Sequence, residues 1–151
     1  MNLNTKYFGA IEYDESDPLA FPQGLFGFPE EREFLLIPFE GSAGTLLCLQ
    51  STATPELAFV VMDPFSLDPA YAPELQRAEL QALGVGSHQD LSYYVLCVVR
   101  DPVAESTVNF KCPVAINPET RVAQQVILET AAYEMRHALS EFGPKAGAGL
   151  C

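Results

Sequence analysis

Asp90-Leu-Ser-Tyr-Tyr-Val-Leu-Cys-Val-Val-Arg100 is the stretch of the chain whose pattern most clearly decides the fold class. Its centre consists of β-branched and aromatic residues, which suit the pleated surface of a β-strand. The central residues are apolar on both faces, as in a strand that packs on both sides, and the run is too short to cross a bilayer. The stretch therefore predicts a β-rich fold with this strand deep inside it.

Shorter apolar runs on either side, bounded by Gly, Pro, Asp and Asn, predict further strands. These expected strands cover residues 7–13, 33–39, 45–50, 57–62, 107–111, 114–117 and 122–128. Many short strands with turn signals between them are typical of antiparallel barrels and sandwiches. We expect a mostly β, single-domain protein with a closed or nearly closed antiparallel β-barrel and one short helix.

The one expected helix begins near Pro73 and ends at Gly84. Proline suits the first helical turn and glycine the position after the last, and an apolar stripe lies between them. The segment 129–142 also has apolar residues that suit a helix, but its pattern is ambiguous. We expect the barrel domain to cover residues 1–142, with a flexible C-terminal tail over residues 143–151.

The chain is strongly acidic, with 20 Asp and Glu against 8 Lys and Arg and a net charge of −12. Such a surface repels phosphate backbones, which argues against direct binding of DNA or RNA, and it attracts basic proteins. Acidity that merely keeps the protein soluble would give the same composition. The N-terminus has no apolar signal-peptide region and the cysteines form no C-x-x-C pair, which predicts a cytoplasmic protein with reduced thiols.

No arrangement in the sequence predicts catalysis, a cofactor or a metal site. Ser87, His88 and Asp90 look like a catalytic triad written in a row, but triad residues converge from separate elements, so a polar turn is the better interpretation. His137 lacks partners at zinc-type spacing, and there is no phosphate-binding loop. We expect the protein not to be an enzyme.

Two motifs are the most specific in the chain. They are the loop Phe21-Pro-Gln-Gly-Leu-Phe-Gly-Phe28 and the stretch Thr107-Val-Asn-Phe-Lys-Cys-Pro-Val-Ala-Ile-Asn117. Together with residues 5–9, 49–51, 58–65 and 125–137, they resemble in order and spacing the FliW family of flagellar assembly factors. The resemblance covers roughly residues 5–139. Phe26 is a departure, because the family usually has proline at this position.

The resemblance implies a regulator that works by binding other proteins. Proteins similar to this one bind the translational repressor CsrA, relieve its repression of flagellin synthesis, and also bind flagellin. An acidic surface complements the basic surface that an RNA-binding repressor needs. A small-ligand-binding β-barrel lined by Phe and Tyr stays open as the alternative function.

Five residues are the candidates for partner contact: Phe26, Phe65, Tyr71, Asn109 and Asn117. Phe26 is an aromatic residue in a loop, so it is either packed or presented to a partner. Phe65 and Tyr71 lie in the loop before the expected helix and are the better candidates for an exposed aromatic anchor. Asn109 and Asn117 flank a bend at Pro113, which cannot donate to a β-ladder. Their amides are expected to satisfy backbone groups at that bend, with partner contact as the other possibility.

Overall fold

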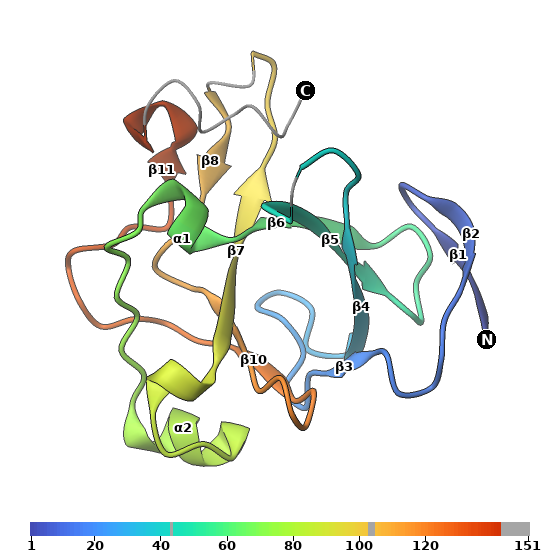
Figure 1. Cartoon of the computed structure of the whole chain (residues 1–151), viewed down its shortest axis with the longest axis horizontal. Coiled ribbons are helices and arrows are strands. Elements are labelled where there is room, and N and C mark those ends of the chain that lie inside the picture. Colours follow the sequence, from blue (N-terminus) through green and yellow to red (C-terminus); the bar gives the residue numbers. More distant parts are fainter. Residues whose placement is uncertain (43, 103–104, 143–151) are drawn as a thin grey trace.

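The structure is a computed structural model that describes residues 1–42, 44–102 and 105–142. The chain folds around one large antiparallel sheet, and a separate two-stranded hairpin lies beside it (Figure 1). The strands are β1 (Asn2–Thr5), β2 (Gly9–Glu12), β3 (Leu19–Ala20), β4 (Glu33–Pro38), β5 (Leu46–Ser51), β6 (Ala58–Met62), β7 (Ser92–Val98), β8 (Thr107–Val108), β9 (Val114–Ile116), β10 (Ala123–Gln125) and β11 (His137–Ala138). The helices are α1 (Pro64–Leu67) and α2 (Arg77–Leu83), with 3₁₀ turns at His88–Asp90 and Leu139–Phe142.

Strand β7 lies at the centre of the sheet, as its sequence predicts. The strand order is β10-β9-β7-β6-β5-β4-β3, and β8 also pairs with β7 and carries β11 at its other edge. Along β7 the side chains alternate, so that Val95 is buried in one hydrophobic cluster while Leu96 packs against another on the opposite face. The predicted strand with apolar contacts on both faces is therefore confirmed.

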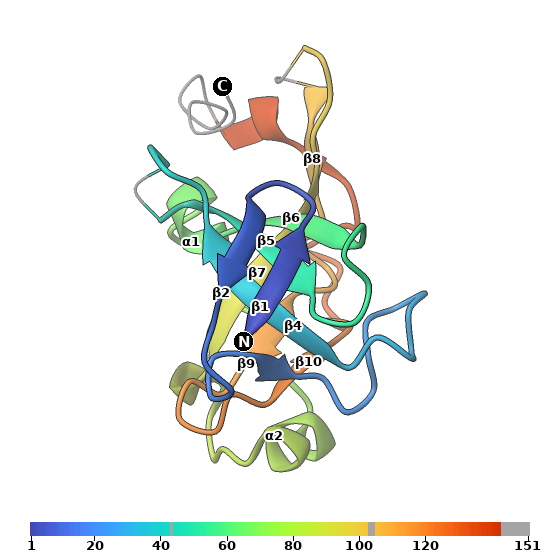
Figure 2. The same ribbon diagram turned by 90° about the vertical axis from the view of Figure 1, so that its right-hand side faces the viewer.

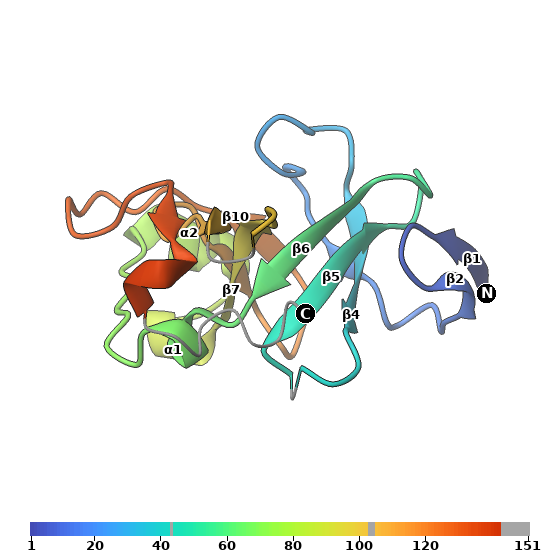
Figure 3. The same cartoon turned by 90° about the horizontal axis from the view of Figure 1, so that it is seen from above.

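The other predicted strands are present, most of them with shorter bounds, and β5 is shifted by one residue from its predicted range. The strand predicted over residues 7–13 is β2, which begins only at Gly9 because residues 6–8 form a turn. Strand β1, on the other side of this turn, was not predicted. The Thr5 hydroxyl accepts from the Phe8 N–H (2.9 Å) and donates to the Gly9 carbonyl (2.7 Å), which closes this turn. The β1–β2 hairpin lies in front of β4 and β5 in Figure 2, and Figures 1 and 3 place it at the end of the molecule opposite α1 and α2.

The predicted helix begins later than expected and is therefore shorter. Pro73 lies outside α2, because the side chains of Gln76 and Glu79 form a capping box that starts the helix at Arg77. Gly84 ends it in the left-handed conformation (φ 74°), as predicted. A single-turn helix, α1, was not predicted; Asp63 caps it by accepting from the Phe65 N–H.

The segment 129–142 is not a continuous helix. It has a turn at residues 131–132, pairs briefly with β8 through β11, and ends in a 3₁₀ turn. Among the described residues no helix is long and apolar enough to cross a membrane. The tail expected over residues 143–151 lies outside the described residues.

The mostly β class is confirmed, but the main sheet is not a closed ladder among the described residues. Its two ends, β3 and β10, are joined only by an isolated parallel bridge between Ala20 and Val122. The Ala20 N–H donates to the Arg121 carbonyl at 2.9 Å next to this bridge. The predicted closed barrel therefore stays a prediction.

Candidate protein-interaction surface

Two hollows lie on either side of the extended segment that connects α1 to α2. The first, which we call the aromatic hollow, has a volume of about 340 Å³ and is lined by Phe65, Tyr71, Ala72, Pro73, His88, Gln89, Leu91 and Tyr93. The second, the acidic hollow, has a volume of about 430 Å³ and is lined by Ala72, Glu74, Leu75, Gln76, Glu129, Thr130, Ala132 and Tyr133. Ala72 belongs to both, so the two hollows adjoin one another.

Phe65 presents an aromatic ring at the aromatic hollow. It lies on α1 and is 40% exposed, while the neighbouring Pro64 and Leu67 are buried and hold the helix on the core. Its ring packs edge-on against Tyr71 and Tyr93, with centroid distances of 5.8 and 6.3 Å. Phe65 therefore combines exposure with a defined position, which is what an anchor for a partner requires.

Tyr71 is buried, so the expectation that it is an exposed anchor is wrong. Only 4% of it is exposed, and its hydroxyl donates to the Phe110 carbonyl at 2.7 Å. Its ring lies 4.7 Å from both Phe110 and Tyr133. Burial raises the pKa of the Tyr71 phenol well above its ordinary value, and the adjacent Tyr133 adds to the rise. Tyr71 thus forms the floor beneath Phe65.

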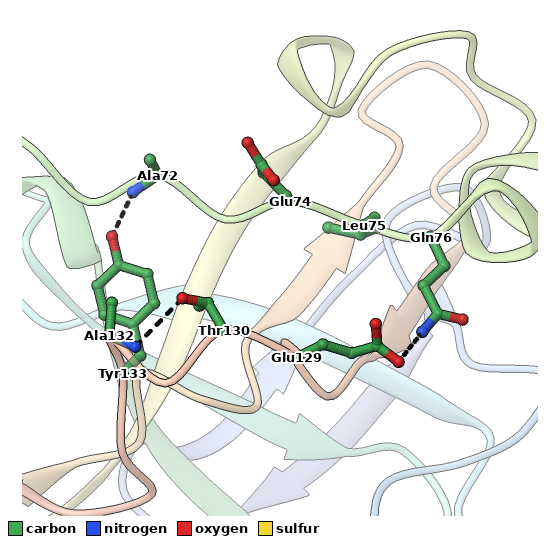
Figure 4. Close-up of a pocket in the computed structure, with 8 residues that line it drawn as sticks. All are labelled: Ala72, Glu74, Leu75, Gln76, Glu129, Thr130, Ala132 and Tyr133. Carbon is green, nitrogen blue, oxygen red and sulfur yellow. Dashed lines mark hydrogen bonds between the residues drawn. The ribbon is translucent and has the colours of Figure 1, made fainter.

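The acidic hollow is bounded by two chain segments that are far apart in the sequence. Figure 4 shows residues 72–76 facing residues 129–133, with a hydrogen bond at each end. At one end the Ala72 N–H donates to the Tyr133 hydroxyl at 2.8 Å. At the other end the Gln76 amide donates to the Glu129 carboxylate at 2.5 Å. These two bonds join the segments at either end of the hollow.

Glu74 and Glu129 are the acidic residues in the lining of this hollow, and in Figure 4 the Glu74 carboxylate points away from residues 129–133. Both residues are exposed, and Glu74 makes no hydrogen bond or ion contact with another described residue. The wall also contains a carbonyl that already accepts from a cation, because the Lys111 ammonium donates to the Thr130 carbonyl at 3.2 Å. Tyr133, Leu75 and Ala132 supply apolar surface between these polar groups.

The acidic charge of the chain is not neutralised by internal ion pairs. In the described part of the chain, the only contact between a carboxylate and a basic group joins His137 and Glu141 at 2.9 Å. The Glu134 N–H donates to the other ring nitrogen of His137, so the ring donates its own proton to Glu141. This bond lowers the pKa of the Glu141 carboxyl. No described Lys or Arg side chain neutralises a carboxylate, so the negative charge of the surface remains to attract a basic partner.

Asn109 and Asn117 have structural contacts, as expected for residues at a bend. The Asn109 carbonyl oxygen accepts from the Cys112 N–H at 2.9 Å, where the chain leaves β8 and before it pairs with β7 again as β9. The Asn117 amide donates to the Leu83 carbonyl at 2.9 Å, at the end of α2, and its oxygen accepts from the Glu119 N–H at 3.0 Å. Asn117 is buried, with 5% of it exposed, so its side chain serves the fold and not a surface contact.

Phe26 lies at the tip of a tight turn on another part of the surface. The Phe28 N–H donates to the Leu25 carbonyl at 2.8 Å, and Gly27 has a φ of 86°. Gly24 is also required, because a Cβ there would lie 2.4 Å from the Phe28 carbonyl oxygen. Phe26 is 50% exposed, and its N–H donates to the side chain of Gln125 at 2.9 Å.

Gln125 is a residue that the sequence did not single out by itself. It is 6% exposed, and besides Phe26 it contacts the bend, because its amide donates to the Cys112 carbonyl at 3.2 Å. It therefore joins the two most specific motifs of the sequence, the Phe26 turn and the Pro113 bend. Glu74, Glu129 and Tyr133 were also missed as surface candidates, since exposed acids and a tyrosine in an ambiguous segment give no pattern of their own.

The groups examined as possible catalytic residues have ordinary structural contacts. The Ser87 hydroxyl accepts from the Gln89 N–H, and the His88 carbonyl accepts from the Tyr93 hydroxyl at 2.6 Å. Burial raises the pKa of Tyr93 to about 12 and the pKa values of Cys48 and Cys97 to about 11. The Tyr93 phenol and the Cys48 and Cys97 thiols are therefore neutral at physiological pH and lack the lowered pKa of an activated nucleophile.

Comparison with known proteins identifies close relatives over nearly the whole chain. A family model described as FliW protein matches residues 2–139. The flagellar assembly factor FliW of Geobacillus kaustophilus (strain HTA426) is 41% identical over 92% of this chain and 95% of its own length. The protein of the same name from Caldanaerobacter subterraneus is 37% identical over 93% of this chain and 94% of its own. A crystal structure of the flagellar assembly factor FliW superposes with a TM-score of 0.86 at 39% identity, covering 92% of this chain and 96% of that one.

Proposed function

The chain belongs to the FliW family of flagellar assembly factors, which are not enzymes, and from this premise we propose that it is a protein-binding regulator of flagellum assembly. In this proposal it binds a CsrA-type translational repressor in the cytoplasm and relieves the repression of flagellin synthesis. It also binds flagellin as a chaperone, so that free flagellin withdraws it from the repressor. The level of flagellin is thereby coupled to its translation.

The proposal rests on the acidic surface, whose carboxylates are not neutralised by Lys or Arg side chains of the described residues. The net charge is −12, and in the described ranges no Lys or Arg forms an ion pair with a carboxylate. A basic RNA-binding protein would gain from such a surface in both encounter rate and orientation. Direct binding to RNA would place phosphates against the same carboxylates, so the proposal includes no nucleic-acid ligand.

The contact surface proposed for these partners includes the two hollows beside Ala72. Phe65 supplies an exposed ring over a packed floor, and Glu74 and Glu129 supply charge beside it. Phe26 is proposed as a second, separate contact, since its ring is half exposed on a turn that glycines and Gln125 hold in place. For Asn109 and Asn117 the proposed role is indirect, because each positions backbone that supports these surfaces.

The experiment that tests the proposal is titration calorimetry with a purified CsrA-type repressor and, separately, with flagellin. We expect both to bind, with affinity for the repressor falling as salt rises from 50 to about 500 mM, since the screening length between exposed charges falls from about 14 Å to about 4 Å over this range. A translation reporter carrying a flagellin leader should be derepressed by the protein and repressed again when flagellin is added. The absence of binding to both partners would overturn the proposal.

We also propose that the sheet closes as a barrel through the junction of Ala20 with Arg121. The hydrogen bond between them and the adjacent bridge support this closure. The Ala20 amide should then exchange with deuterium as slowly as amides of β5, whereas a frayed edge would exchange within seconds to minutes.

A further inference from the structure

We propose that the β1–β2 hairpin is a hinged cover, which lifts off the main sheet while the rest of the fold stays intact and thereby exposes Cys48. Figure 2 shows this hairpin in front of β4 and β5, whose outer face it covers. The motion does not depend on the proposed function, because it follows only from how the hairpin is held.

Hydrogen bonds hold the hairpin weakly. Strands β1 and β2 pair only with each other, and among the described residues the only hydrogen bond from residues 1–13 to the rest of the chain joins the Lys6 N–H to the Gln50 side chain at 3.0 Å. Gln50 is buried, and its amide donates to the Pro55 and Leu57 carbonyls at 3.0 and 3.3 Å whether or not the hairpin is in place. Water can replace the Lys6 N–H at the Gln50 oxygen, so this bond contributes little to keeping the hairpin down.

A small apolar contact provides the rest of the attachment. Leu3 is the only buried residue of the hairpin. The rings of Tyr7 and Phe8 lie 5.8 and 5.0 Å from the ring of Phe39, which directly follows β4, but Tyr7 is still 46% exposed. Segments with so few buried apolar contacts open at a lower free energy than the whole protein unfolds. The hairpin is therefore the part of the sheet region that we expect to open first.

The chain is anchored again directly after the hairpin, which defines a hinge. The Arg121 side chain donates to the Asp17 carbonyl from Nε at 2.9 Å, and β3 begins at Leu19. Residues 14–16 are exposed, and Asp14 forms hydrogen bonds only with Asp17. Rotation about residues 14–16 would lift the hairpin and leave Asp17 and β3 in place.

Cys48 lies under the cover and can report its motion. It precedes Gln50 by two residues on β5, so both side chains are on the face that meets the hairpin. Cys48 has no exposed surface. Burial raises the pKa of its thiol to about 11, and the Lys6 ammonium offsets part of this rise, which places a charge of the hairpin near the sulfur.

The first test is thiol labelling of the full chain at pH 8, in urea concentrations below the global unfolding transition. Peptide mass spectrometry identifies which cysteine carries the label. We expect Cys48 to be labelled while Cys97 stays protected. Static exposure predicts the opposite order, because Cys97 is 8% exposed and Cys48 is 0% exposed. Labelling of Cys97 first, or of both only in the global transition, would overturn the proposal.

The second test compares two probes on opposite sides of the same contact. If the hairpin lifts as a unit, hydrogen exchange of the Lys6 amide and labelling of Cys48 should give the same opening constant, to within about 3-fold. The variant Y7A/F8A should raise both constants by roughly 5- to 150-fold, because two aromatic pairs are lost.

The control variant I127A removes a side chain about as exposed as Tyr7, at 49%, from a segment outside the hairpin. It should change neither constant by more than about 2-fold. Different opening constants for the Lys6 amide and the Cys48 thiol, or equal effects of Y7A/F8A and I127A, would show that Cys48 is reached by another route and would overturn the proposal.

Discussion

Replacing Phe26 with proline tests whether the Gln125 hydrogen bond or the turn itself determines the stability of the Phe26 loop. Phe26 occupies the first central position of a turn whose second is Gly27 with a φ of 86°, a position that favours proline. Proline at a compatible site stabilises by about 0.4–1 kcal/mol through the unfolded chain. In this protein, however, the Phe26 N–H donates to Gln125 at 2.9 Å, and proline has no N–H.

The magnitude follows from the burial of Gln125, which is 6% exposed. Leaving its carbonyl oxygen unpaired costs about 1–3 kcal/mol, which outweighs the gain from proline. F26P should therefore lower the free energy of unfolding by about 0.5–2 kcal/mol in urea titrations. Since a chain of this size loses about 2–4 °C per kcal/mol, the melting temperature should fall by a few degrees.

Two further variants separate the hydrogen bond from the lost aromatic ring. F26A keeps the N–H and should change stability by no more than about 0.5 kcal/mol, because Phe26 is half exposed. In a Q125A background the acceptor is absent, so F26P should become stabilising by up to about 1 kcal/mol. Stabilisation by F26P in the wild-type background would refute the reasoning, and so would an equal loss in both backgrounds.

Four other predictions follow from the same contacts. N117A should lower the free energy of unfolding in urea by about 1–3 kcal/mol because the buried Leu83 carbonyl loses its donor, and N109A, at a half-buried site, should lower it by less. If both variants lost partner binding without losing stability, the two asparagines would be contact residues and not structural ones. Y71F should cost about 1–2 kcal/mol through the orphaned Phe110 carbonyl, whereas F65A should weaken partner binding with a smaller change in melting temperature, and the opposite pattern would contradict the assigned floor and anchor. Cys48, Cys97 and Cys112 are buried with raised pKa values, so they should react with a thiol reagent at pH 8 only after urea is added. Burial favours the neutral thiol, so the free energy of unfolding should decrease as the pH rises from about 9 through about 11, the pKa of Cys48 and Cys97 in the folded protein. The pKa of Glu141 is lowered in the fold, so its contribution should be present above the ordinary carboxyl value and lost as the pH falls below it, and E141Q should remove this acid dependence from the melting curve.

Local pattern in the sequence was enough to determine much of the fold. The alternation in β7, the punctuation between strands and the Gly84 end of α2 all act over a few residues, so they can be read without knowledge of distant partners. The amides of Asn109 and Asn117 were predictable for the same reason, since a proline that breaks a ladder leaves backbone groups nearby to satisfy. Membership of the family was equally visible, because motifs in register survive substitution at single positions such as Phe26.

What the sequence by itself did not determine depends on contacts between distant segments. The helical pattern in 129–142 is overridden because His137 pairs with Val108 and Tyr133 bonds Ala72, contacts that outweigh local propensity. Tyr71 reads as a loop residue but is buried, because Phe110 and Tyr133 enclose it. The acidic hollow exists only where residues 72–76 meet residues 129–133, so its lining depends on tertiary packing that no local spacing encodes.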